Sequence, residues 1–523
     1  MILTLLAAVP LIGAVAVAVL GRFRSDHPAE GVRGAIIAVA FSVITLAISL
    51  VALGRYDLGA GGYQLTSEHE WIEVFGAHYA VGVNGIGITM VLLTTVLTPL
   101  VLVAASGDRL ARPERMPTYL ALILTVEGLA IAAFTATDAF LFYVMFEATL
   151  VPLYFLIGMF GGPGRSYAAM KFLIYNLVGG LLMLAATVGL YVVSSDAGEP
   201  SFLLTDLQNL DIGTNTERLL FLGFMAAFAV KAPLWPFHTW LPDAAAEATP
   251  GTSVMMVSVL DKLGTYGMIA WCLAIFPNAA DWAAPVILVL AVISIIYGAL
   301  LAVGQEDMRR LIAFTSVSHF GFIIMGIFAF TTTSMSGATL YMFNHGISTA
   351  ALFLVTGVMI ARRGSGLIAD FGGVQKIAPI MSGFLLVAGL SSLSLPGLAP
   401  FVSEFMVLAG TYTRSIPLAA IATIAIVLAA MYILIMYQRT MTGPLSDDAR
   451  GVTDLVTREK IALAPMVVLI VGLGFFPQPL LNVINPAVDA VASHVGVGDP
   501  EPRTPTQIQV PATQQSDAEE GGH

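Results

Sequence analysis

Long apolar runs separated by short polar connections make up the chain from its first residues to about residue 482. An α-helix rises 1.5 Å per residue, so about 20 consecutive apolar residues cross the hydrocarbon core of a bilayer. By this measure the pattern predicts an all-α integral membrane protein with fourteen transmembrane helices. The expected spans are 2–21, 32–54, 81–105, 117–136, 138–160, 167–194, 218–241, 250–276, 283–303, 309–330, 337–361, 378–410, 416–438 and 459–482.

The composition agrees with a membrane protein and excludes several other classes. Of the 523 residues 57% are hydrophobic and only 11% are charged, and the mean hydropathy is +0.86. Soluble proteins carry about 25% charged residues, so a water-soluble enzyme, a disordered chain and a disulfide scaffold are excluded. Lipid bilayer is the expected surrounding, and nothing in the sequence suggests a nucleic-acid partner.

Neither a cofactor nor a metal ion is expected in this chain. Cys272 is the only cysteine, which excludes a disulfide framework and a cysteine-based zinc or iron–sulfur site. The sequence has no phosphate-binding loop and no dinucleotide-binding glycine motif. Metal ligands at close spacing are also missing.

The distribution of positive charge predicts how the chain is oriented. No Lys or Arg precedes the first apolar run, and Arg22 and Arg24 follow it, which is the reverse of a cleaved signal peptide. Seventeen of the 23 Lys and Arg residues fall in alternate connections, four fall in the others and two lie within spans. By the positive-inside rule the first set is cytoplasmic, and both termini are external.

Two polar segments lie outside the spans. The external connection 55–80 is acidic and aromatic, with Glu68, Glu70, Trp71 and Glu73, and we expect it to fold against the membrane surface. The polar, proline-bearing tail 497–523 is expected to be disordered.

Several ionisable side chains lie inside the predicted spans, where a charge costs about 2.5–3.5 kcal/mol on insertion scales. Such residues usually mark ion pathways. In order along helices 4, 5, 7, 8, 10, 11 and 12 they are Glu127, Glu147, Lys231, Lys262, His319, His345 and Glu404.

Lys231 is followed by Pro233 and Pro236 within a single predicted span. Each proline removes an intrahelical hydrogen bond, so helix 7 should be broken. A break at membrane depth is tolerated only where it is buried or lines a wet cavity, and transporters build ion sites from such breaks. The alternative is a simple proline kink with Lys231 held by backbone carbonyls.

Helix 12 repeats this arrangement, because Pro396, Gly397 and Pro400 precede Glu404. The two breaks lie five helices apart, an odd number, so the corresponding helices run in opposite directions. We therefore expect two inverted five-helix repeats, helices 4–8 and 9–13, each forming a half-channel. The expected divisions are 1–110 (helices 1–3), 111–276 (first half-channel), 277–441 (second half-channel), 442–496 (helix 14) and 497–523 (tail).

The other candidates have alternatives. His238, His319 and His345 can transfer protons or can be ordinary buried hydrogen-bonding residues. Lys262 can act at the membrane centre or extend to an interface. Its neighbour Asp261 is not its obvious partner, because adjacent helix positions do not face each other. Glu127 can act in transfer or bond a neighbouring helix, and Asp243 and Glu247 can form part of a cytoplasmic proton inlet.

Four segments carry a family resemblance: FYVMFEATLVP (142–152), KAPLWPFHTWLPDAAAEATPGTS (231–253), LDKLGTYG (260–267) and LPGLAPFVSEF (395–405). With them the chain resembles the antiporter-like membrane subunits of respiratory complex I, and it is most similar to their M-type. The resemblance runs from the first predicted helix to the last. It implies fourteen helices with two inverted half-channels joined by a central line of charged residues.

The resemblance also implies a function. The chain would be a non-redox, proton-translocating membrane-arm subunit of NADH–quinone oxidoreductase in a bacterial plasma membrane, moving protons from the cytoplasm outward. L-type and N-type antiporter-like subunits would be its neighbours. FMN, iron–sulfur clusters and quinone would belong to partner subunits.

The resemblance further assigns roles to residues. Glu147 and Lys231 would be the pair that controls the cytoplasmic half-channel, Lys262 the bridge and Glu404 the end of the external half-channel. The relays would be His238, His319 and His345. An acid at position 404 favours the M-type, because the L- and N-types usually carry lysine there. One departure is Ala245, where the family often has histidine.

These residues suggest a switch. We hypothesise that Lys231 keeps its proton while Glu147 is close and releases it when the two separate. At about 4 Å and an effective dielectric of about 20, separation costs roughly 4 kcal/mol. One charge crossing about 150–200 mV needs roughly 3.5–4.6 kcal/mol, a similar amount. Rival functions are a sodium- or potassium-for-proton antiporter subunit, a passive membrane scaffold and, least favoured, a solute carrier.

Overall fold

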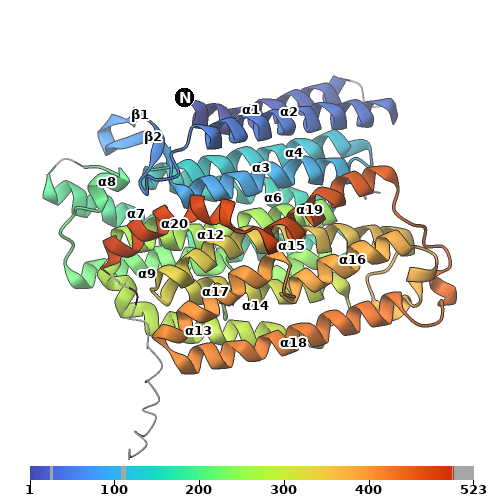
Figure 1. Cartoon of the computed structure of the whole chain (residues 1–523). Helices are drawn as coiled ribbons and strands as arrows, with labels where there is room; N and C mark the ends of the chain where they lie inside the picture. The colour runs from blue at the N-terminus through green and yellow to red at the C-terminus, as the bar shows by residue number, and fades with distance from the viewer. Residues whose placement is uncertain (24–27, 108–112, 199, 497–498, 500–523) are drawn as a thin grey trace, which may run out of the picture.

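The structure is a computed structural model that describes residues 1–23, 28–107, 113–198, 200–496 and 499. Its long helices run side by side in one bundle (Figure 1). In the N-terminal part the helices are α1 (Ile2–Phe23), α2 (Pro28–Gly54), α3 (Gly85–Ala105), α4 (Met116–Thr135), α5 (Ala139–Ala148), α6 (Leu150–Phe160), α7 (Arg165–Ala197), α8 (Leu204–Leu207), α9 (Thr214–Lys231) and α10 (Trp240–Glu247).

The C-terminal part continues the bundle. Its α-helices are α11 (Pro250–Ser253), α12 (Lys262–Gly267), α13 (Pro277–Val303), α14 (Met308–Phe328), α15 (Thr332–Arg363), α16 (Pro379–Ser392), α17 (Ala399–Arg414), α18 (Ile416–Met441), α19 (Thr457–Phe475) and α20 (Gln478–Val495). Two π-helical stretches, Val254–Leu260 and Met268–Leu273, flank α12.

Ten helices in the described residues are long and apolar enough to cross a membrane, and an eleventh is reached if the bent pair α19 and α20 forms one span. The predicted helical membrane fold is therefore confirmed. The number of such helices is lower than the predicted fourteen spans, because several of the predicted spans are interrupted and so do not count as one long helix. The spans predicted at 218–241, 250–276 and 378–410 each contain a break or a change of helix type.

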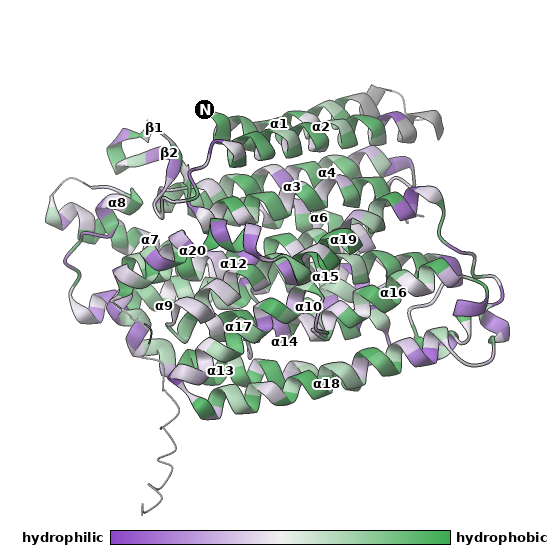
Figure 2. Ribbon diagram, in the orientation of Figure 1, coloured by the Kyte–Doolittle hydropathy of each residue, from purple (hydrophilic) through white to green (hydrophobic). Residues whose placement is uncertain are grey.

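The central helices are buried within the bundle, and the outer helices expose apolar side chains on the surface of the bundle. Every residue of α14 from Leu311 to Phe328 is buried, and α15 packs against both α14 and α17. At the edges of the bundle, α2 and α18 expose large apolar side chains such as Ile36 and Val427. Figure 2 shows hydrophobic residues along these helices and polar residues gathered toward the two ends. This pattern suits a lipid environment around a packed core.

The connection at 55–80 contains the one sheet of the described residues, which the helical pattern did not predict. Strand β1 (Gln64–Ile72) pairs antiparallel with β2 (Ala77–Val83). The chain reverses at Gly76, whose φ of 62° favours glycine. Tyr79 in β2 donates a 3.1 Å hydrogen bond to Thr4 of α1. The hairpin therefore packs on the end of the bundle where α1 begins (Figure 1), which we call the hairpin end; the opposite end, with Lys171 and Arg310, is called the basic end.

The predicted last helix, 459–482, differs from the structure. Helix α19 ends at Phe475, and α20 follows at an angle of 70°. Leu481, Ile484 and Val488 of α20 are buried, and α20 packs across α3 and α15. Because its apolar residues occupy one face, α20 lies on the bundle instead of extending the span. The predicted disordered tail lies outside the described residues except for Asp499, which accepts a 2.8 Å hydrogen bond from the amide of Thr332.

Candidate functional site

The predicted break in helix 7 is present and begins directly after Lys231. Helix α9 ends at this residue and α10 starts at Trp240. The turn is closed by the indole of Trp240, which donates a 3.0 Å hydrogen bond to the carbonyl of Val230. Lys231 is only 1% exposed and is the last residue of α9, in the carbonyl-end turn where a positive side chain is favoured.

Lys231 reaches the region of Glu147 without touching it. Its Nζ donates a 3.3 Å hydrogen bond to Thr149, the residue between α5 and α6, and lies 4.8 Å from the centre of the Phe146 ring. Glu147 is half-buried, and its Oε1 has no hydrogen-bond partner in the part of the chain that the structure describes. The charges of Glu147 and Asp261 both act on Lys231. The predicted pair is thus close but not joined by a direct ion pair.

The Glu147 carboxylate is positioned by a glycine on the facing helix. A Cβ on Gly180 of α7 would overlap both carboxylate oxygens of Glu147. Glu147 therefore occupies the space that any larger residue at position 180 would take. This contact was not evident from the sequence, because it joins two helices.

Lys262 lies in the centre of the bundle. Its side chain is fully buried, and its Nζ donates a 2.9 Å hydrogen bond to the carbonyl of Val257 in the preceding π-helical turn. The same nitrogen is 2.7 Å from Nδ1 of His345 and 4.6 Å from the centre of the Phe320 ring. These contacts overturn the alternative that Lys262 extends to a membrane interface.

His345 starts a row of side chains that leads to Glu404. The ring centres of His345 and His319 are 5.2 Å apart, and those of His319 and Tyr341 are 5.8 Å apart. Tyr341 donates a 2.9 Å hydrogen bond to Oε2 of Glu404. We call the set Lys262, His345, His319, Tyr341 and Glu404 the central line. All of its members are buried. The structure thus brings three of the predicted residues, His345, His319 and Glu404, into one row with Lys262.

The second predicted break lies beside Glu404. Helix α16 ends at Ser392 and α17 begins at Ala399. Within the break Ser394 has a φ of 58°, a left-handed conformation that is uncommon for residues other than glycine. Its hydroxyl donates to Oε2 of Glu404. The break therefore supplies a hydrogen-bond donor to the buried acid, together with Tyr341.

Asn344 helps to fix the helix that carries Glu404. Its side-chain amide donates a 2.8 Å hydrogen bond to the carbonyl of Ala399 and a 3.3 Å hydrogen bond to Ser403. Both acceptors lie in the first turns of α17. The carbonyl of Ala399 and the acid at position 404 are thereby tied to α15, the helix that also carries Tyr341 and His345.

Two of the sequence candidates lie apart from the central line. The ring of His238 packs 5.3 Å from that of Tyr297 in α13, and its Nδ1 has no hydrogen-bond partner within the described ranges. Glu127 in α4 is completely buried, and neither carboxylate oxygen has a hydrogen-bond partner among the described side chains and backbone. The structure does not connect either residue to Glu404.

Asp243 forms a junction at the basic end. It accepts 2.7 Å hydrogen bonds from Lys171 of α7 and Arg310 of α14. Burial acts to raise the pKa of Asp243, but the hydrogen bonds and positive charges of Lys171 and Arg310 outweigh it and hold the pKa below its ordinary value. Its neighbour Glu247 accepts a 2.8 Å hydrogen bond from the amide of Gly164. Both proposed inlet residues thus have structural partners.

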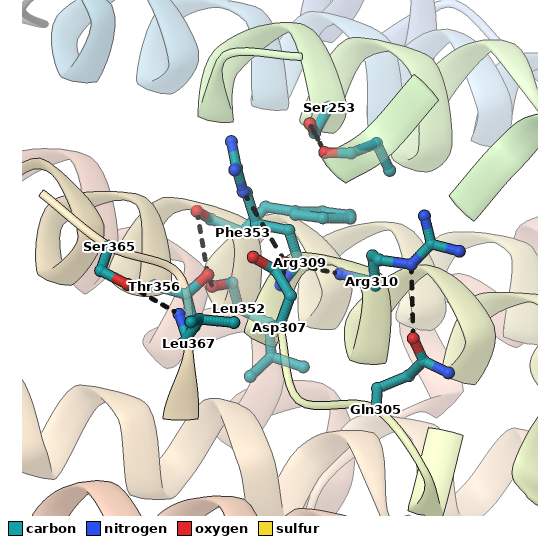
Figure 3. A network of polar contacts seen from close by, with 11 residues as sticks. Ser253, Gln305, Asp307, Arg309, Arg310, Leu352, Phe353, Thr356, Ser365 and Leu367 are labelled. Atoms are coloured by element: carbon teal, nitrogen blue, oxygen red, sulfur yellow. Dashed lines mark hydrogen bonds and ion pairs between the residues drawn. The ribbon is translucent and has the colours of Figure 1, made fainter. Parts of the chain in front are cut away.

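The loop before α14 carries the rest of this junction (Figure 3). Asp307 caps α14 by accepting hydrogen bonds of 2.9 and 3.1 Å from the amides of Arg309 and Arg310. The Nε of Arg310 donates a 3.3 Å hydrogen bond to Gln305. The cap and the glutamine therefore orient Arg310 toward Asp243.

Sequence reasoning missed two polar residues of the site, Tyr341 and Ser394, and set aside a third, Asp261. Tyr341 and Ser394 bond Glu404, and Asp261 is buried beside Lys262. A carboxyl within an apolar span was the available signal for Asp261. Tyr341 and Ser394 gave no comparable signal, since tyrosine and serine are common in membrane helices.

Comparison with known proteins gives one family. Residues 136–429 match the family model described as NADH:quinone oxidoreductase/Mrp antiporter, TM. A protein of Mycobacterium tuberculosis named NADH-quinone oxidoreductase subunit M is 49% identical, with 100% of this chain and 99% of that protein covered. The subunit M of Rhodobacter capsulatus is 36% identical over 93% of this chain and 95% of its own length.

Solved structures agree with the sequence comparison. A chain of respiratory complex I from Thermus thermophilus superposes with a TM-score of 0.85 at 28% identity, covering 94% of this chain and 100% of that one. A chain of the Mrp complex from Dietzia sp. has a TM-score of 0.80 at 21% identity, covering 94% and 98%, and shows the shared fold. The chain belongs to the NADH:quinone oxidoreductase/Mrp antiporter family, in the subunit M group of NADH-quinone oxidoreductase.

Proposed function

We propose that the central line carries protons toward the hairpin end, as the membrane-arm step of a redox-driven proton pump. The main support is the row of buried side chains from Lys262 to Glu404, in which hydrogen-bond contacts join Lys262 to His345 and Tyr341 to Glu404, and ring packing joins His345 to His319 and His319 to Tyr341. Every group in it holds or passes a proton. Burying ionisable side chains within a membrane costs free energy, and residues of this kind usually mark ion or proton pathways.

Lys231 and Glu147 act as the switch that feeds this line. When Glu147 approaches the ammonium, the pair favours the charged lysine; when Glu147 withdraws, desolvation favours loss of the proton. Support comes from the arrangement in which the lysine donates to Thr149 while a carboxylate oxygen of Glu147 has no partner among the described residues. His238, one residue from the Tyr175–Thr239 hydrogen bond of 2.7 Å, serves the inlet side.

The topology belongs to the same proposal. Counted through its breaks, the chain makes fourteen passages, and helices 4–8 and 9–13 form inverted half-channels. The breaks after Lys231 and before Glu404 support this symmetry. With the basic end in the cytoplasm, both termini are external. Tyr79 of the hairpin contacts Thr4 near the N-terminus, and Asp499 near the C-terminus contacts Thr332 at the start of α15. Protons then move outward across a bacterial plasma membrane.

Energy for pumping comes from partner subunits in this proposal. The chain carries out no redox step; FMN, iron–sulfur clusters and quinone belong to other chains of the complex, and its membrane neighbours are the L-type and N-type subunits. The superposition on a chain of Thermus thermophilus respiratory complex I supports such an assembly.

The test uses inverted membrane vesicles that contain the whole complex. We expect Lys231→Ala and Glu147→Ala each to leave assembly intact, as judged by native electrophoresis, and to depress proton uptake driven by NADH. A matched control is Lys460→Ala, which removes a lysine that lies on α19, outside the central line. Uptake is followed by quenching of a pH-sensitive dye.

Two outcomes would contradict the proposal. Unchanged NADH-driven proton uptake in both Lys231→Ala and Glu147→Ala would favour a passive membrane scaffold as the function. Proton exchange that depends on added sodium or potassium and proceeds without NADH would favour a cation/proton antiporter; the family description includes the words Mrp antiporter.

A further inference from the structure

One buried carboxyl, that of Asp261, has no place in the line described above. Asp261 is 1% exposed, and its Oδ2 has no hydrogen-bond partner within the residues that the structure describes. A buried polar group without a partner is rare in native proteins and needs an explanation. Helix capping does not provide one, because no side-chain cap hydrogen bond from Asp261 is formed at the start of α12.

The helix face that carries Asp261 packs against the end of α9. Gly264 follows Asp261 by three residues and so lies on the same face. A Cβ on Gly264 would stand 2.6 Å from the amide nitrogen of Ala232, the residue after Lys231. One turn further on, Gly267 lies against the ring of Phe228 in α9. The segment from Asp261 to Gly267 therefore runs antiparallel to α9. Asp261 lies toward the end of α9 that carries Lys231.

The backbone at Asp261 also differs from a regular α-helix. Its amide donates a 3.0 Å hydrogen bond to the carbonyl of Met256, five residues earlier, at the end of the π-helical stretch. Short π-helical segments occur frequently at functional sites, where they change the direction of side chains. The next residue, Lys262, uses the same turn to reach the carbonyl of Val257 and the ring of His345.

Asp261 thus stands between the two buried lysines. Its charge interacts with that of Lys262 and also with that of Lys231. Lys231 and Lys262 lie on different helices, and no direct contact between them is formed within the described ranges. A gap is left between the switch and the central line, and Asp261 is a buried carboxyl next to Lys262 whose helix face packs against the Lys231 end of α9.

We propose that Asp261 is the proton carrier between Lys231 and Lys262. This inference rests on the proposed function and adds a step to it. The ammonium of Lys231 gives a proton to the carboxylate of Asp261, leaving a neutral amine and a carboxylic acid. The acid then gives the proton to the neutral amine of Lys262 and returns to a carboxylate. Each step breaks one N–H or O–H bond and forms another.

A purely structural role makes different predictions. If Asp261 only balanced the positive charge of the lysines, a neutral side chain of the same shape would destabilise the charged lysines and disturb the fold or assembly. A carrier instead requires a group that both accepts and releases a proton. Glutamate has this property and asparagine lacks it, although asparagine has the shape of aspartate.

The experiment compares Asp261→Asn and Asp261→Glu in the assembled complex in inverted vesicles. We expect Asp261→Asn to assemble normally, shown by unchanged ferricyanide reduction by NADH, and to lower NADH-driven proton uptake by about tenfold or more. We expect Asp261→Glu to restore a large part of the uptake. Infrared difference spectra between the resting and energised complex should lose a carboxylic-acid band in Asp261→Asn.

The results separate this inference from the function on which it rests. Full uptake in Asp261→Asn, with uptake abolished by Lys231→Ala, would overturn the carrier role and leave the switch intact. Full proton uptake in both Asp261→Asn and Lys231→Ala would overturn the proposed function itself. If Asp261→Asn prevented assembly, the carrier role would stand or fall on Asp261→Glu and on the infrared band of the native complex, whose absence would contradict it.

Discussion

The hydroxyl of Tyr341 in α15 donates a 2.9 Å hydrogen bond to the carboxylate of Glu404 in α17. The same oxygen of Glu404 accepts from Ser394. Two hydroxyl donors therefore meet one buried acid at the end of the central line. A hydroxyl both donates and accepts, so Tyr341 can pass a proton to Glu404 and take another from the histidine side.

Tyr341→Phe is expected to slow proton transfer to Glu404. The change removes one hydrogen bond to a buried acid, a loss of about 1–3 kcal/mol, and keeps the ring that fills the core. A loss of this size in the transition state corresponds to about tenfold or more in rate. The measurement is NADH-driven proton uptake by inverted vesicles, normalised to the amount of assembled complex.

The matched control is Tyr437→Phe. Tyr437 shares a 2.9 Å hydrogen bond with Ser382 at the start of α16, away from Glu404. This variant loses a comparable hydroxyl and should pump normally. Equal uptake by both tyrosine variants would show that the hydroxyl of Tyr341 has no part in transfer.

Ser394 gives a prediction in which the backbone cost and the hydrogen bond to Glu404 are tested separately. Its left-handed backbone costs roughly 1–2 kcal/mol for a residue with a Cβ. Ser394→Gly relieves that cost and also removes the donor to Glu404. We expect the Ser394→Gly complex to be inactivated at a higher temperature than the Ser394→Ala complex, which loses the same hydrogen bond, while proton uptake falls in both.

Ser394→Ala separates the two effects. It removes the same hydroxyl but keeps the backbone cost, so its uptake should match that of Ser394→Gly without the gain in heat resistance. Native uptake in both variants would mean that Tyr341 alone serves Glu404.

Gly180→Ala tests the position of Glu147. The new methyl group would take the space of the Glu147 carboxylate and force it to another position. Alanine is favoured over glycine by about 1 kcal/mol in a helix, so α7 itself should not be weakened. Proton uptake should fall although the complex assembles fully, and both are measured on the same vesicles.

Gly189→Ala on the same helix is the control. A Cβ there would meet the end of the Leu220 side chain, which can rotate away. If Gly180→Ala pumped like Gly189→Ala, the present position of Glu147 would be irrelevant to the switch.

The sequence predicted the features that depend on local chemistry. Pro233 and Pro236 lack an amide hydrogen, so the break after Lys231 followed from residue type alone. Likewise, buried Lys262 and Glu404 were recognisable because charges are rare in apolar helices. Their roles in proton transfer remain predictions.

What the sequence did not predict depends on contacts between distant segments. Asp261 was set aside because adjacent positions of a regular α-helix do not face each other, whereas its charge acts across to Lys231 on α9 and its helix is π-helical at this point. Tyr341 and Glu404 are 63 positions apart. The α20 helix was missed because its apolar residues form one face, which a search for continuous apolar runs does not detect.

Asp243 connects α7 and α14 through Lys171 and Arg310, so Asp243→Asn should weaken the basic end by about 1–3 kcal/mol, seen as a lower temperature of half-inactivation. Because the positive partners hold the pKa of Asp243 below its ordinary value, the carboxylate stabilises the fold at every pH above that value. The difference between native and variant complex should thus stay constant from about pH 8 to pH 5 and shrink only below about pH 4, as the native carboxylate becomes protonated. Glu247→Gln, which keeps an acceptor for Gly164, should show no such difference. A difference that already shrank between pH 8 and pH 6 would contradict the low pKa of Asp243.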